Sequence, residues 1–106
     1  MGGLRKFSAI ESTNLAGSER KLTVTGEVET RRSNETPGLV EASPQGINPD
    51  ILILDVTIAT DGLGNDVMGW KEVVPFVKPI SRRQYTHVTI RREDDTETIE
   101  VQEILS

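Results

Sequence analysis

The residue types needed for nucleophilic catalysis occur in this chain of 106 residues, but they are scattered along it. A serine nucleophile needs a histidine base and a carboxylate that orients the base, and Ser43, His87 and Asp55 supply these three types. No Gly-x-Ser-x-Gly elbow supports such a site. His87 alternates with Val88 and Ile90, which predicts that its side chain lies on the outer face of a strand. We therefore predict no catalytic residue, and a small hydrolase that uses His87 stays as a third hypothesis.

A calcium site is the second chemistry that the sequence suggests. Three oxygen-bearing side chains fall at ligand positions one, five and twelve of a helix–loop–helix calcium site, namely Asp61, Asn65 and Glu72. Leu63 replaces a required oxygen ligand, and Asp66 stands where a glycine forms the sharp turn. The same glycine-rich segment lacks the spacing of a phosphate-binding loop. The sequence thus predicts a plain connection between strands, with no metal and no cofactor.

Composition and charge argue against several kinds of partner. The formal net charge is −5, whereas a nucleic-acid-binding domain gains its affinity from a positive surface. The longest aliphatic run, residues 51–54, is too short to cross a bilayer, and the first residues lack the apolar run of a signal peptide. The absence of cysteine favours a reducing compartment. We expect a soluble, cytoplasmic protein that binds neither nucleic acid nor membrane.

The hydrophobic pattern that must position these residues has a period of two, and apolar residues do not recur at helical spacing over three turns. In the clearest example Leu22, Val24, Gly26 and Val28 alternate with polar side chains, as in an antiparallel strand with one face in water. We predict one domain, residues 1–106, with strands at 4–10, 21–29, 39–42, 51–60, 70–80, 84–92 and 97–105.

Individual residues predict how some of these strands are placed. Gly26 within a strand indicates a bulge or a close backbone approach. The 51–60 segment has an aliphatic face and a mixed face, which is typical of a central strand covered on both sides. Pro75 and Pro79 remove hydrogen-bond donors from the 70–80 segment, which therefore belongs at a sheet edge.

The last two segments read as a hairpin in which Val88 and Ile90 meet Ile99 and Val101 as one core face. Six or seven short strands at this spacing favour an all-β, antiparallel β-sandwich, and we prefer an immunoglobulin-like arrangement. A small open β-barrel is the alternative.

A resemblance covers most of the chain from Leu22 onward. The chain resembles small bacterial all-β domains of unknown function, and the resemblance implies no activity. It is carried by Glu41, by the run Pro44, Gln45, Gly46, Ile47, Asn48 and Pro49, by the strand end Ile53, Leu54 and Asp55, and by Ile99, Val101 and Glu103.

The mixed face of the 51–60 segment is the first candidate interaction surface. Ile51 and Ile53 lie there beside Asp55 and Thr57, and a monomer would leave two large aliphatic side chains in water. We predict a homodimer joined through this face, with Asp55 accessible at its rim or paired with an arginine. On this interpretation the chain is a non-enzymatic interaction or structural module whose partner is another protein or itself.

A loop stiffened by two prolines is the second candidate. It consists of Pro44, Gln45, Gly46, Ile47, Asn48 and Pro49. The corresponding alternative function is an inhibitor or peptide-binding module that presents this loop or accepts a strand at a sheet edge.

Overall fold

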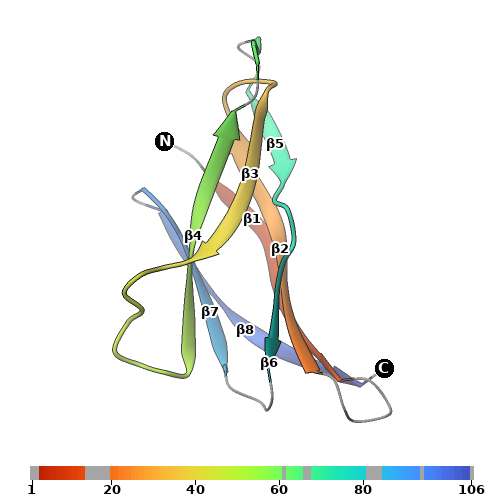
Figure 1. The fold of residues 1–106 in the computed structure, drawn as a ribbon, viewed down its shortest axis with the longest axis vertical. Coiled ribbons are helices and arrows are strands. Elements are labelled where there is room, and N and C mark those ends of the chain that lie inside the picture. Colours follow the sequence, from red (N-terminus) through yellow and green to blue (C-terminus); the bar gives the residue numbers. More distant parts are fainter. Residues whose placement is uncertain are drawn as a thin grey trace.

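Eight strands make up the fold (Figure 1). The structure is a computed structural model and describes residues 3–13, 20–60, 62–65, 68–80, 85–93 and 95–105. No helix in these ranges has the length and apolar character of a membrane span. The strands are β1 (Leu4–Thr13), β2 (Arg20–Thr30), β3 (Glu35–Glu41), β4 (Ile51–Thr60), β5 (Gly69–Glu72), β6 (Phe76–Ile80), β7 (His87–Arg92) and β8 (Asp95–Leu105).

The strands form one strongly curved sheet in the order β3-β4-β7-β8-β1-β2-β5, and β6 also pairs with β2. Strand β8 belongs to both halves, because residues 95–100 pair with β7 and residues 101–105 pair with β1. Two pairs, β1 with β8 and β4 with β7, are parallel, so the sheet is mixed where an antiparallel one was predicted. Parallel pairing joins segments far apart in the chain, which a local pattern does not reveal.

The two ends of this sheet approach each other and nearly close a barrel. The Val74 amide donates a hydrogen bond to the Pro37 carbonyl over 3.0 Å. Further along, Lys78 Nζ lies 2.7 Å from Glu41 Oε1. The all-β class is confirmed, and of the two predicted architectures the small open barrel fits this arrangement. The described residues form eight strands, against the six or seven predicted.

The core consists of alternate residues of the strands, as the period of two predicts. Its fully buried members are Leu22, Val24, Val28, Leu52, Leu54, Val88 and Ile90. The predicted hairpin is confirmed, with Val88 opposite Ile99 across the β7–β8 ladder. Val101, however, pairs with Ala9 of β1, because the pairing partner of β8 changes from β7 to β1 between residues 100 and 101.

Strand β4 has the predicted bounds, but it is not covered on both sides. Leu52 and Leu54 face the core with no exposed surface. On the opposite face Thr57 and Ala59 are exposed, and none of the described strands forms a second layer there. The mixed face is therefore an outer face of the barrel, and its composition reflects partial cover by a loop.

The predicted 70–80 strand is divided into β5 and β6 by residues 73–75. Pro75 lies in this interruption, where the chain needs no ladder donor. Both parts pair only with β2 within the described sheet, so the predicted edge position is confirmed. Strand β3 begins at Glu35, four residues earlier than predicted, since Pro37 is accommodated within this edge strand.

Gly26 marks a close approach, as predicted. The irregularity lies in the neighbouring strand, where the β1–β2 register shifts between Arg5 and Ser8 and Lys6 adopts a φ of 56°. The Phe7 ring then lies against Gly26, so that a Cβ added there would be only 2.3 Å from Phe7 Cδ1. Glycine is required at this position because the aromatic ring occupies the volume of a side chain.

The connection from β2 to β3 is held by two charged side chains. Glu35 Oε1 accepts hydrogen bonds from the main-chain amides of Arg31 (2.7 Å) and Arg32 (3.0 Å). Lys71 Nζ donates to the carbonyl oxygens of Ser33 and Glu35, each over 2.7 Å. Side chains from β3 and β5 thus bond main-chain groups of this turn.

Glu35 makes the stability of this turn depend on pH. The two amides that donate to its carboxylate lower the pKa of Glu35 below the usual 4.5. A lowered folded-state pKa stabilises the fold above pH 4.5, and this contribution is lost as the pH falls through the folded-state pKa. We therefore expect the stability difference between the wild type and Glu35→Gln to shrink below pH 4.5, measured by urea unfolding at several pH values.

The exposed Glu100 provides the charge-matched control for this measurement. Glu100→Gln removes the same formal charge without touching the turn. A difference between wild type and Glu35→Gln that stays constant from pH 3 to pH 7 contradicts the assignment.

Candidate functional site

The candidate site is the 43–50 loop, which leaves the end of β3 and returns to the start of β4 (Figure 1). All eight of its residues are exposed. The side chain of Ile47 is fully exposed, with a relative accessibility of 102%. Single exposed aliphatic side chains are common on protein surfaces, and Ile47 is a candidate contact residue because of the loop that carries it.

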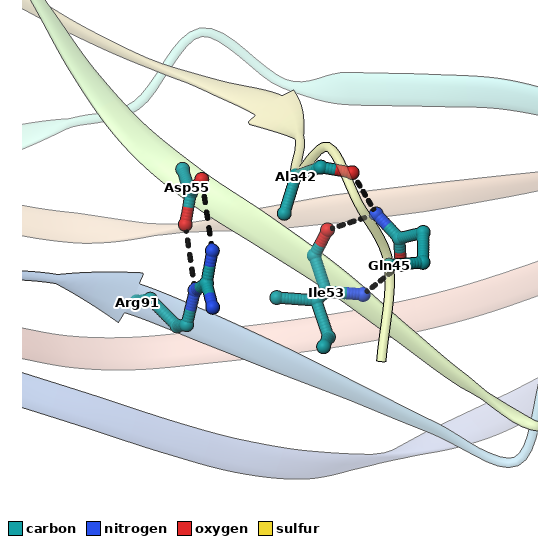
Figure 2. Close-up of polar contacts among 5 residues, drawn as sticks. All are labelled: Ala42, Gln45, Ile53, Asp55 and Arg91. Carbon is teal, nitrogen blue, oxygen red and sulfur yellow. Dashed lines mark hydrogen bonds and ion pairs between the residues drawn. The ribbon is translucent and has the colours of Figure 1, made fainter. Parts of the chain in front are cut away.

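Gln45 fixes the first half of the loop to β4 (Figure 2). Its Nε2 donates to the carbonyl oxygens of Ala42 (2.6 Å) and Ile53 (3.0 Å), and its Oε1 accepts from the Ile53 amide over 2.8 Å. The Ala42 amide also donates to the Ile53 carbonyl over 2.9 Å. The Gln45 amide group therefore takes the place of a peptide group at the edge of β4 where β3 has ended.

Asn48 and Asp50 fix the second half of the loop. Asn48 Oδ1 accepts from the Asp50 amide over 2.9 Å, and the Asn48 carbonyl accepts from the Ile51 amide over 3.2 Å. The Asp50 carbonyl accepts from the Thr86 amide over 2.8 Å, which ties the loop to the start of β7. The returning half of the loop is thus anchored to two strands.

The middle of the loop differs from its two ends in its main-chain hydrogen bonding. Within the described part of the chain, the main-chain groups of Gly46 and Ile47 have no hydrogen-bond partner. A Cβ added to Gly46 would lie 3.0 Å from Ile53 Cδ1, so the backbone here rests on β4 and the Ile47 side chain lies away from it. The loop thus presents one apolar side chain and two unpaired peptide groups from a base that is fixed at both ends.

The predicted interaction surface lies beside this loop. Ile51 and Ile53 are only half-buried, while Thr57 is exposed. Asp55 accepts two hydrogen bonds from Arg91, of 2.8 and 3.1 Å, as Figure 2 shows, and this contact raises the pKa of Arg91. The predicted pairing of Asp55 with an arginine is confirmed.

The reason for expecting a homodimer is weaker than the sequence suggested. The 43–50 loop covers part of Ile53, so a single chain does not leave both isoleucines in water. Self-association through this face stays a prediction, and light scattering tests it.

The residues considered for chemistry are not brought together. His87 Nδ1 lies 2.9 Å from Thr86 Oγ1, and His87 pairs with Ile51 in the ladder. Asp55 pairs with Arg91, four residues further along β7, which is about 13 Å at strand rise. Asp55 is thus engaged elsewhere and does not orient the imidazole.

The positions that were compared with a calcium loop lie only partly within the described residues. Asp61 and Asp66 lie outside those residues, and Glu72 is part of β5. In the described ranges no group of three or more histidine, cysteine, aspartate or glutamate side chains is arranged to hold a metal ion.

Two polar features were not foreseen from the sequence. Glu11 is 1% exposed, and among the described residues neither of its carboxylate oxygens has a hydrogen-bond partner. Arg20 Nε lies 3.5 Å from Glu11 Oε1. On the outer face of β5, the Arg5 guanidinium lies 4.1 Å from the Trp70 ring centroid and 2.7 Å from Glu27. A local pattern shows neither contact, because each depends on the register of separate strands.

Comparisons with known proteins yield no match among family models, curated proteins or solved structures.

Proposed function

We propose that the chain is a non-enzymatic protein-interaction module whose contact site is the 43–50 loop, with Ile47 as the side chain that a partner protein buries. The observation that carries this proposal is the full exposure of Ile47 on a loop anchored at both ends. The lack of cysteine supports a cytoplasmic location for this interaction.

The energetics of such a contact favour the loop over the outer face of β4. Burial of one exposed isoleucine contributes roughly 1.5–3 kcal/mol. Most loops lose part of this gain because they must be ordered on binding. The hydrogen bonds of Gln45 to Ala42 and Ile53 already fix the first half of this loop, so less conformational entropy is lost there on binding.

Acceptance of a strand at a sheet edge is less well supported. The free edges of the barrel are those of β3 and of β5 and β6, and they face each other. The hydrogen bond from Val74 to Pro37 and the ion pair of Lys78 with Glu41 cross between them. An added strand would have to displace these contacts before it could pair.

Site-specific photo-crosslinking tests the proposal. A photoreactive amino acid replaces Ile47 in one variant and Leu63 in the other, since Leu63 is equally exposed and lies in the β4–β5 connection at the opposite end of the molecule (Figure 1). We expect a product with one defined protein at position 47 and none at position 63, read by mass spectrometry of extracts from the organism that encodes the chain.

The same experiment has outcomes that contradict the proposal. Equal product patterns at positions 47 and 63 would mean that both residues sample proteins at random. A product between two copies of the chain, obtained from position 53 and not from position 47, would support the homodimer instead.

A further inference from the structure

We infer that the free edge of β8 accepts an extended, basic segment of a partner protein as an added strand. The segment pairs with the main chain of Thr96 and Thr98, and its lysine or arginine side chains meet the carboxylates of Asp95 and Glu97. This site is separate from the 43–50 loop, so the inference goes beyond the proposed function and does not rest on it.

The first half of β8 has a strand partner on one side only. Residues 95–100 pair with β7, and β1 joins β8 only from Val101 onward. Figure 1 shows β1 and β8 diverging from there toward the start of β8. The edges of β3, β5 and β6 block each other where the barrel closes, whereas within the described chain no strand pairs with the second side of residues 95–100. This stretch is therefore an open edge, to which an extended peptide can add.

The alternation of peptide groups along β8 identifies the free ones. The Val101 amide donates to the Thr86 carbonyl, on the β7 side, over 2.9 Å. Since successive residues of a strand direct their main-chain groups to opposite sides, those of Thr96 and Thr98 point away from β7. Both residues are exposed, and in the described structure their main-chain groups have no partner on that side. Each thus offers one donor and one acceptor to an added strand.

Carboxylates line this edge, and none of them has an ion-pair partner among the described residues. They are Glu93, Asp95, Glu97 and Glu100. Glu97 is half-buried, and a carboxylate that is partly withdrawn from water is stabilised when a cation binds beside it. Strand addition supplies such a cation, because it places a partner side chain directly opposite each position of β8.

The neighbouring arginines do not neutralise the edge. Arg91 donates to Asp55, and Arg92 donates to the main-chain carbonyl of Glu29. On the β1 side, the Arg5 guanidinium lies over the tryptophan ring of β5. The edge therefore keeps a negative potential, which attracts basic chains.

The same charges determine which occupant fits the edge. Two copies of the chain that paired through it would bring their carboxylates together, which disfavours self-association. A basic segment instead gains an ion pair at alternate positions. Because Asp95, Glu97 and the half-buried Ile99 share one face of β8, the expected partner has two basic residues and one apolar residue at alternate positions.

A synthetic peptide tests this inference with the full chain. Its residues are, in order, valine, threonine, lysine, threonine, lysine, threonine and valine, so that the peptide reads the same in both strand directions. We expect binding that weakens as salt is added. We also expect the amides of Thr96 and Thr98 to become protected from hydrogen exchange, which NMR follows residue by residue.

Two control peptides separate strand addition from attraction by charge alone. The first has glutamate in place of both lysines. The second keeps both lysines, but all its amides are methylated and cannot donate to the main chain of β8. We expect neither peptide to bind at the concentration at which the unmodified peptide saturates the chain.

Charge reversal on β8 supplies the matching protein variants. Glu97→Lys should weaken binding of the lysine peptide on the order of 10-fold and allow the glutamate peptide to bind. Glu72→Lys makes the same change on β5 and should leave the affinity for both peptides unchanged. Ile47→Ser should also leave it unchanged, which separates a failure of this site from a failure of the 43–50 loop. Melting temperatures show that each variant is folded.

The inference is wrong if the methylated peptide binds as tightly as the unmodified one, because the carboxylates would then act by charge alone. It is also wrong if the unmodified peptide protects neither Thr96 nor Thr98, and the carboxylates would then serve only to keep strand edges of different copies apart. Protection that rises with the concentration of the chain alone would identify a second copy as the occupant and overturn the assignment of a basic partner.

Discussion

Leu54→Ala should lower the free energy of unfolding by about 2–5 kcal/mol. Leu54 has no exposed surface and lies in β4, which is paired on one side with β3 and on the other with β7. The substitution removes buried apolar surface and leaves a cavity that neighbours on three strands cannot fill without moving. Stabilities of domains lie at about 5–15 kcal/mol, so the loss is a large share of the total.

Leu63→Ala is the matched control for this prediction, because it makes the same chemical change at a fully exposed position. Urea unfolding followed by the fluorescence of Trp70 reports both variants. We expect the Leu63 variant to unfold within about 0.5 kcal/mol of the wild type. Equal losses in the two variants would show that β4 does not face the core as described.

The second large effect is expected at Gly26. A methyl group there would lie 2.3–2.6 Å from three atoms of the Phe7 ring, so that the ring or the β1–β2 ladder has to move. Overpacking of this kind costs about 1–3 kcal/mol. Gly26→Ala should therefore destabilise the fold, measured by the same unfolding experiment.

Gly69 provides the control, since it also lies in a strand and a Cβ there would have no atom within 4 Å. Gly69→Ala should be neutral or slightly stabilising, because alanine loses less conformational entropy on folding. In the double variant with Phe7→Ala, the cost of Gly26→Ala should largely disappear, which a double-mutant cycle measures. Full additivity in that cycle would contradict the contact between Phe7 and Gly26.

The parts of the fold that the sequence predicted are those governed by alternation within one strand. The bounds of β4 and the hairpin that places Val88 opposite Ile99 follow from the period of two and from a polar turn. The interruption of the strand at Pro75 was not predicted. Its physical cause, the hydrogen-bond donor that proline lacks, was used only to predict that the 70–80 segment lies at a sheet edge. The parallel pairs and the near-closure of the barrel depend on contacts between distant segments, which no local pattern encodes.

The candidate site was predicted in its position but not in its construction. Two prolines and Gly46 identified the loop, yet nothing in the sequence showed that the Gln45 side chain would replace a peptide group of the sheet. Asp55 was predicted either to be accessible at the rim of a dimer face or to pair with an arginine, and only the parallel register of β4 and β7 selects Arg91. Hydrogen bonds between side chains and other strands are therefore the feature of the site that could not be predicted from the sequence.

The shared strand β8 has a consequence for the order in which the chain can fold during synthesis. Strand β1 pairs along its second half with β8, which follows about 80 residues after β1 ends. Until β8 has left the ribosome, β1 carries an unpaired edge, and β7 lacks its antiparallel partner. Closure of such distant segments is slow, on the scale of milliseconds to seconds. The nascent chain thus passes through a period in which open strand edges and uncovered valines such as Val88 are available to chaperones or to other unfinished chains.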